Sequence, residues 1–473
     1  MDVHINNFFT PDAKTGERKR VHMIGIGGSS MSGLAQMLAI KGCRVTGSDR
    51  DESEHTRTLA ARGIEVFIGH KPENVEGADL VVYTAAIAPD NCERVHAREL
   101  GIPEMERAVL LGQLMEGYKR AVNVCGTHGK TTTSAMLAQT LWELNTNPTV
   151  HIGGDLPALG GSTLAGGHEC FVAEACEFNR SFLHFNPTHV VMLNIEADHL
   201  DCYGTFENLL AAFHQFAAKV PEDGYLIGYG DDPNVMDIMN EVECNILSFG
   251  MSDENDVYPA NLTYDEFGRA TCDVMLFGQP MTKLTLSVPG EYMLINALAV
   301  MACTYSLGLD AHLVAATLGH FTGVHRRFEL TSVTDGVAVY TDYGHHPTEI
   351  RNVLSVAMQQ PHRKLWAVWQ PHTYSRTKNL FKDFVKCFDG VDHVLITDIY
   401  GAREKDPGDI KTEMLLPHLR ARGLVVNHTP TFDDAEAYLR KYWKPGDLVI
   451  TLGCGNINLL NDQIKEHGDS VEG

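Results

Sequence analysis

The stretch that decides the fold is Gly126-Thr-His-Gly-Lys-Thr-Thr-Thr133, which stands between an apolar run and a segment with helical spacing. Residues 121–125 predict a buried strand, and residues 135–142 carry apolar side chains at the period of an α-helix. A strand, a glycine turn and a helix start form a phosphate-binding loop, because backbone N–H groups and the helix dipole favour an anion. Lys130 adds a positive charge and Thr131 can bind Mg²⁺. We therefore expect a bound nucleoside triphosphate, with a plain glycine-rich turn as the alternative.

Composition limits the class of protein. The chain has 473 residues, enough for three domains of about 150 residues each. Its formal net charge of −23 disfavours nucleic acid and anionic membranes as partners. We find neither a signal-like apolar segment near the start nor an apolar run of about 18 residues. The eleven cysteines show no zinc-site or disulfide spacing, which is typical of a cytoplasmic protein.

The N-terminal block has the pattern of a dinucleotide-binding βαβ unit. A strand over residues 21–24 leads through the glycine loop 25–30 into a helix over residues 31–40, and a second strand ends at Asp49. Asp49 lies where an acidic ribose ligand is expected, but the third glycine of the motif is Ser30. The block predicts a nucleotide moiety. A nicotinamide-dependent dehydrogenase and a purely structural turn stay open.

Polar residues follow the strands of the central block. The apolar run 169–173 stops at Glu174, and the run 189–193 is followed by Asp198 and His199. Because ligands bind beyond the carboxyl ends of parallel strands, we expect these side chains near the phosphates and Mg²⁺. Beyond this block, four apolar runs from residue 337 to residue 452 again end in polar clusters, notably residues 341–347 and 370–377.

The fold class that follows is α/β in three domains: a Rossmann-like domain over residues 1–107, a central phosphate-loop ATPase domain with a mostly parallel sheet over 108–325, and a Rossmann-like α/β domain over 326–473.

In this order the motifs resemble the Mur ligase family, the ATP-dependent amide-forming enzymes of peptidoglycan precursor synthesis. The resemblance runs over nearly the whole chain and is carried by the segments 25–35, 126–133, 174–183, 194–199, 326–329, 342–347 and 372–377, with Asn296. The chain departs from the family pattern at Ser30, where glycine is usual, and at Tyr292 and Met293, where His and Asn are usual.

The resemblance implies an ATP-dependent ligase that joins L-alanine to the lactyl carboxylate of UDP-N-acetylmuramate through an acyl phosphate, with Mg²⁺ or Mn²⁺. It implies catalytic roles for Lys130, Glu174, His199, His345 and Arg376, and metal ligands at Thr131, Glu174 and His199. It implies ATP contacts at Gly126, Thr127, His128, Gly129, Lys130, Thr131, Thr132, Asn296, Arg327 and Asp342. UDP-sugar contacts are implied at Gly27, Gly28, Ser29, Met31, Ser32, Asp49, Thr84 and His199, and amino-acid contacts at Tyr343, His346, His372 and Arg376.

Two alternatives to this activity remain at the level of sequence. One is a murein tripeptide ligase, which attaches a preformed peptide to the same sugar nucleotide. The other is a nucleotide-gated regulatory protein without ligation, which the presence of Lys130, Glu174, His199 and Arg376 disfavours. For the oligomeric state, we expect either a monomer or a homodimer.

Overall fold

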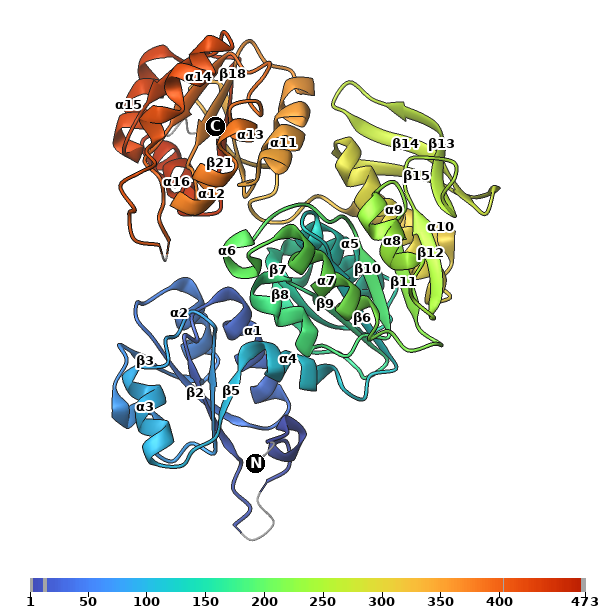
Figure 1. Cartoon of the computed structure of the whole chain (residues 1–473), viewed down its shortest axis with the longest axis vertical. Coiled ribbons are helices and arrows are strands. Elements are labelled where there is room, and N and C mark those ends of the chain that lie inside the picture. The colour runs from blue at the N-terminus through green and yellow to red at the C-terminus, as the bar shows by residue number, and fades with distance from the viewer. Residues whose placement is uncertain (1–2, 12–14, 403, 469–473) are drawn as a thin grey trace. The chain divides into compact units, whose positions relative to one another are not determined.

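The computed structural model describes residues 3–11, 15–402 and 404–468 and contains three β-sheets (Figure 1). One sheet lies in each of the three predicted ranges, and parallel strands dominate all three, which confirms the α/β class. The described chain divides into two compact units. The first unit takes residues up to 260 with 273–283 and 295–318, and the second takes 261–272, 284–294 and the residues from 319 on. The predicted domain boundaries stay predictions.

The N-terminal sheet is fully parallel, in the order β3-β2-β1-β4-β5. Its strands are β1 (Arg20–Ile24), β2 (Arg44–Asp49), β3 (Glu65–Ile68), β4 (Leu80–Tyr83) and β5 (Glu104–Glu106). Its helices are α1 (Ser29–Ile40), α2 (Glu54–Ala61), α3 (Cys92–Glu99) and α4 (Arg107–Met115). Strand β1 is buried from its second residue on, as expected for a central strand covered on both faces.

The central sheet has ten strands in the order β15-β14-β13-β12-β11-β10-β6-β9-β7-β8. Its parallel part places β6 (Arg120–Cys125) between β10 (His189–Met192) and β9 (Cys170–Glu174). The other strands are β7 (Thr149–Leu156), β8 (Gly161–Leu164), β11 (Tyr225–Tyr229), β12 (Asn245–Phe249), β13 (Val257–Tyr264), β14 (Arg269–Leu276) and β15 (Gln279–Pro289). The helices are α5 (Lys130–Glu143), α6 (Leu200–Tyr203), α7 (Phe206–Ala217), α8 (Pro233–Met239), α9 (Glu291–Ser306) and α10 (Ala311–His320).

The third sheet lies in the second unit and has the order β16-β17-β21-β18-β19-β20. It is parallel except at its edge, where β16 runs antiparallel to β17. Its strands are β16 (Glu329–Thr334), β17 (Val337–Asp342), β18 (Leu365–Trp369), β19 (His393–Ile396), β20 (Val425–His428) and β21 (Leu448–Leu452). Its helices are α11 (Pro347–Gln359), α12 (Tyr374–Asn379), α13 (Phe381–Phe384), α14 (Leu416–Ala421), α15 (Phe432–Tyr442) and α16 (Asn458–Glu466).

Among the described residues, none of the helices combines the length and apolar character that crossing a bilayer requires.

Candidate active site

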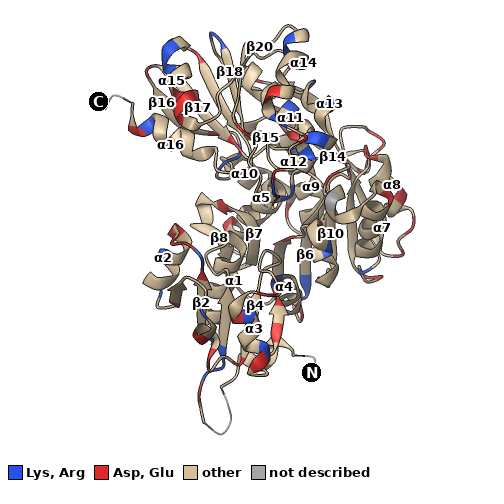
Figure 2. Cartoon of the chain, turned by 60° about the vertical axis from the view of Figure 1, so that its left-hand side comes forward, with Lys and Arg blue, Asp and Glu red and all other residues tan. Residues whose placement is uncertain are grey.

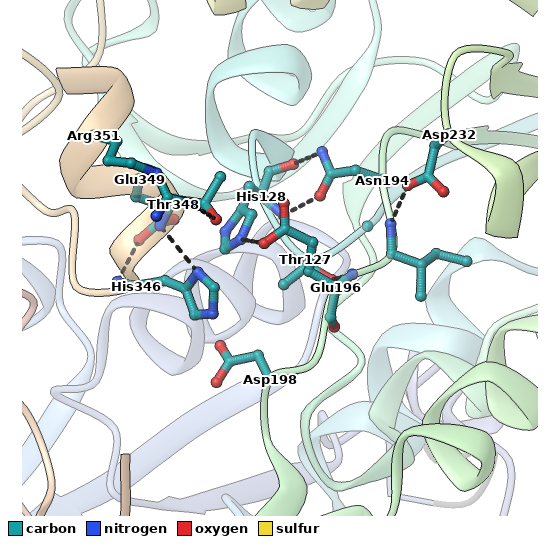
Figure 3. Close-up of polar contacts among 12 residues, drawn as sticks. Thr127, His128, Asn194, Glu196, Asp198, Asp232, His346, Thr348, Glu349 and Arg351 are labelled. Carbon is teal, nitrogen blue, oxygen red and sulfur yellow. Dashed lines mark hydrogen bonds and ion pairs between the residues drawn. The ribbon is translucent and has the colours of Figure 1, made fainter. Parts of the chain in front are cut away.

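The phosphate loop joins β6 to α5 and depends on two glycines. Gly126 has φ 132° and Gly129 has φ 84°, values that residues with a Cβ rarely adopt. The loop is held by Asn194, which follows β10: the N–H of His128 donates to Oδ1 of Asn194 (2.8 Å), and Nδ2 of Asn194 donates to the carbonyl of His128 (3.1 Å; Figure 3). The N–H of Thr127 donates to the carbonyl of Asn194 (2.8 Å). The sequence pattern had not singled out this asparagine as the support of the loop.

Lys130, the first residue of α5, points back over the loop. Its Nζ donates to the carbonyls of Gly126 (2.5 Å) and Thr127 (2.9 Å) and forms an ion pair with Glu177 (2.9 Å). Burial disfavours the ammonium charge, but the charges of Glu177 and Glu174 outweigh burial and raise the pKa of Lys130. The ammonium is therefore charged at neutral pH and fixed beside the loop. Glu177 was not predicted as a site residue.

Glu174 ends β9 beside the start of α5. Its Oε2 accepts hydrogen bonds from Oγ1 of Thr131 (2.8 Å) and from the N–H of Gly153 (3.0 Å). A carboxylate and a hydroxyl oxygen next to a phosphate loop are the donors that Mg²⁺ prefers, so these residues fit the predicted ion. Thr132 is buried in the first turn of the helix.

His199 lies close to the same group of residues. It precedes α6 with φ 54°, and its Nε2 is 3.6 Å from Oε1 of Glu177 and 3.7 Å from Oδ2 of Asp198. Its ring packs edge-on against Phe178, with 5.1 Å between centroids. Lys130 and His199 are therefore arranged around one carboxylate, that of Glu177. Asn296 lies against the loop, because a methyl group on Gly129 would come within 2.9 Å of its Oδ1.

The N-terminal loop is closed by Asp49. Oδ2 of Asp49 accepts the N–H of Gly27 (2.8 Å), and a Cβ on Gly27 would come within 2.9 Å of that oxygen. Thr84 lies beside Gly25, within 3.1 Å of a methyl group placed there. Two predicted UDP-sugar residues turn inward: Met31 belongs to the hydrophobic core, and Oγ of buried Ser32 donates to the carbonyl of Ser29 (2.9 Å). Only the backbone of those two residues remains suited to a ligand. Gly28 caps the N-terminus of α1, where backbone N–H groups favour an anion.

In the second unit, Asp342 ends β17 in a buried position. Its carboxylate accepts the N–H groups of Phe328 (2.8 Å) and Gly344 (2.6 Å). Burial raises the pKa of Asp342 to about 6, against the opposing charge of Arg327. Burial and the charge of Asp342 also raise the pKa of Tyr292, so Tyr292, Arg327 and Asp342 form one group.

The predicted amino-acid residues gather at the carboxyl ends of β17 and β18 in the same unit. Nη1 of Arg376 lies 3.1 Å from Nδ1 of His372, and the rings of His345 and His372 are 6.1 Å apart. The ring of Tyr343 packs edge-on against His345. His346 caps α11, since its Nδ1 accepts the N–H of Thr348 (3.3 Å; Figure 3).

Glu349 holds both histidines of this cluster, a role that the sequence did not suggest. Its Oε2 accepts the N–H of His345 (3.0 Å) and of His346 (3.3 Å). The same oxygen lies 3.4 Å from Nδ1 of His345.

The chain matches three family models: "Mur ligase family, catalytic domain" over residues 20–119, "Mur ligase middle domain" over 124–304 and "Mur ligase, glutamate ligase domain" over 326–455. The UDP-N-acetylmuramate–L-alanine ligase of Acetivibrio thermocellus is 46% identical over 454 residues, 96% of this chain and 97% of that protein.

Solved structures agree in fold. The UDP-N-acetylmuramate-alanine ligase MurC of Thermotoga maritima has a TM-score of 0.80 at 29% identity, covering 94% of this chain and 98% of the other. A murein peptide ligase of Psychrobacter arcticus has a TM-score of 0.72 at 22% identity, covering 95% and 98% of the two chains. Sequence identity over nearly the full length of both chains, together with the phosphate loop and its carboxylates, leads to one conclusion: the chain belongs to the Mur ligase family.

Proposed function

We propose that the chain is an ADP-forming UDP-N-acetylmuramate–L-alanine ligase that acts in the cytoplasm. The observation that carries this proposal is the 46% identity, over 96% of the chain, to a protein of that name. The arrangement of Lys130, Glu174 and Glu177 around the phosphate loop supports the ATP-dependent step.

In the first step a lactyl carboxylate oxygen attacks the γ-phosphorus of ATP, the bond to the β–γ bridging oxygen breaks, and ADP leaves with those electrons. The obstacle is charge: two unit charges 4 Å apart repel by about 4 kcal/mol at an effective dielectric constant of 20. Lys130 meets this obstacle with a fixed ammonium. Mg²⁺ would supply further positive charge to the phosphates, and Thr131, Glu174 and His199 would hold it.

In the second step the alanine nitrogen attacks the acyl carbon and inorganic phosphate leaves. Arg376 suits the alanine carboxylate because its planar guanidinium can donate to two oxygens. A histidine of the set His345, His346 and His372 accepts the proton that the amine loses, since the ordinary pKa of histidine is near 6.5. Asp342, with Arg327, suits the ATP ribose and phosphates.

The acceptor is the point at which a murein tripeptide ligase would differ. The test measures phosphate release from ATP with UDP-N-acetylmuramate and either L-alanine, L-serine, glycine or the tripeptide. We expect turnover with L-alanine and weak discrimination against residues of similar size. Turnover with the tripeptide alone would overturn the proposed acceptor, and NAD binding without UDP-sugar binding would restore the dehydrogenase alternative.

A further inference from the structure

Ser30 stands where glycine is usual in this loop, and its side chain reaches across to the central sheet. Its Oγ lies 2.8 Å from Nε2 of His151, which is on β7. Nη1 of Arg107, the first residue of α4, donates to the same oxygen (3.0 Å). The nucleotide loop is thus joined to a strand that lies 121 residues away in the chain.

The ring of His151 uses both nitrogens. Its Nδ1 lies 3.1 Å from Oγ1 of Thr163, the residue paired with it on β8. Burial, with the charge of Arg107, lowers the pKa of His151 to about 3, so the ring is neutral and has one N–H. Because Arg107 can only donate to Ser30, a consistent direction has the hydroxyl of Ser30 donating to Nε2 and Nδ1–H donating to Thr163.

Helix α1 packs closely against the pair of His151 and Thr163. A Cβ on Gly33 of α1 would lie 2.0 Å from Oγ1 of Thr163 and 3.4 Å from Nδ1 of His151. The helix that begins at the nucleotide loop therefore lies directly on this pair, at a distance that only glycine permits.

Strand β7 continues from His151 to a contact with Glu174. Two residues further on, the N–H of Gly153 donates to Glu174, which also accepts the hydroxyl of Thr131. Residues 151–153 of β7 thus contact Ser30 of the nucleotide loop and Glu174, the candidate metal-binding carboxylate.

We propose that His151 is a positioning residue: its contact with Ser30, together with the contact of Gly153 on the same strand with Glu174, fixes the UDP-sugar loop relative to the phosphate loop, so that the sugar carboxylate meets the γ-phosphate in line. This inference rests on the proposed function. A positional error of about 1 Å can cost on the order of 100-fold in rate, so such a link acts on kcat more than on binding.

The test uses the two nitrogens separately in the full-length protein. In His151→Asn the shorter side chain keeps a donor near the position of Nδ1, so the bond to Thr163 remains and the bond to Ser30 is lost. In His151→Gln the longer side chain reaches Ser30, and the bond to Thr163 is lost. We expect His151→Asn and Ser30→Ala each to lower kcat by about 10- to 100-fold, with the Kd for UDP-N-acetylmuramate changed little. His151→Gln should recover part of the rate. The double variant Ser30→Ala/His151→Asn should be no slower than the slower of the two single variants, because both substitutions remove the same hydrogen bond.

His189 provides the matched control. It is also buried in the central sheet, its pKa is also lowered (to about 4), and it bonds locally to Thr188, but it begins β10 at the end of the strand away from the phosphate loop. His189→Asn should change the Tm without the selective fall in kcat. Equal kcat losses in His189→Asn and His151→Asn, or a wild-type kcat in His151→Asn, would overturn the inference.

A readout independent of turnover separates this inference from the proposed function. Nitrogen NMR of the wild-type protein should show His151 neutral, with Nδ1 protonated and Nε2 bare, at pH 6, and Ser30→Ala should shift Nε2. An Nε2 signal that Ser30→Ala leaves unchanged overturns the link even in an inactive protein, whereas a wild type without phosphate release overturns the proposed function alone.

Discussion

At the scale of single residues, the central contact is the buried pair of Lys130 and Glu177. The Lys130 side chain is 12% exposed and that of Glu177 is 2% exposed, so neither charge is well solvated. From the sequence alone, Lys130 serves only the ligand and its removal should leave the fold near normal. The structure shows that removal of Lys130 also lowers stability, because it leaves the buried carboxylate of Glu177 without its positive partner.

Lys130→Ala should therefore abolish phosphate release and also destabilise the first unit by about 3 kcal/mol. Adding Glu177→Gln removes the orphaned charge, so the double variant should regain much of the stability but none of the activity. Urea unfolding and a phosphate assay measure the two effects. Normal turnover in Lys130→Ala would refute the role of the loop in ATP binding.

Asp342 gives a prediction for pH. Burial raises its pKa from 3.8 to about 6, so the folded second unit binds this proton more tightly than the unfolded chain does. Its contribution to stability is therefore present below about pH 4 and is lost as the pH rises through 6, by about 3 kcal/mol in total. The stability of the wild type relative to Asp342→Asn should fall by that amount between pH 3 and pH 7 in denaturant titrations. A constant difference would contradict the raised pKa.

At the scale of elements, the phosphate site is the start of α5, and its geometry depends on Gly129. A Cβ there would crowd Oδ1 of Asn296 (2.9 Å) and Cδ1 of Leu193 (3.2 Å). Gly117, two residues after the end of α4, has nearly the same φ (86° against 84°) but no heavy atom within 4 Å of a Cβ placed on it.

Gly129→Ala and Gly117→Ala form a matched pair. Both variants pay the cost of left-handed backbone, of order 1 kcal/mol, which urea unfolding measures. We expect only Gly129→Ala to raise the KM for ATP, since only its methyl group displaces Asn296 and the loop. An equal change of KM in both variants would show that backbone strain, rather than contact with the site, is responsible.

At the scale of the whole molecule, net charge opposes the substrates. The chain carries a formal net charge of −23, and acidic and basic residues are both scattered over the described ribbon (Figure 2). In α3 and α15 the first turn carries acidic residues and the last turn carries basic ones. A surface of this kind does not attract a nucleotide polyanion. Positive charge must therefore come from individual side chains of the site, such as Lys130, or arrive with the nucleotide as a bound cation.

Removing divalent ions should consequently abolish turnover while leaving the fold intact. We expect EDTA to stop phosphate release, and excess Mg²⁺ or Mn²⁺ to restore it, with circular dichroism unchanged throughout. Glu174→Gln should raise the Mg²⁺ concentration needed for half-maximal rate. Full activity in EDTA would exclude a metal role for Thr131 and Glu174.

Much of the fold could be predicted, because strongly apolar strands and glycine turns are local signals. Residues 44–49, predicted as a strand, form β2, and the predicted helix after the phosphate loop is α5. Exposed or irregular strands carried no clear pattern: β16, with one buried residue among its six, and the β7–β8 hairpin were not predicted. The inward turn of Met31 and Ser32 also could not be read from the motif, since only packing decides which side of α1 faces the core.

The sequence by itself determined the phosphate loop, the family and the residue types at the ends of the strands, because these depend on spacing within a few residues. Only the tertiary structure decided the partners: Glu177 for Lys130 across 47 residues, Asn194 for His128 across 66, and His151 for Ser30 across 121. The physical reason is the order of strands, since β6 lies between β10 and β9, with β7 next. That order arises when the whole sheet buries its apolar faces, and no local pattern encodes it.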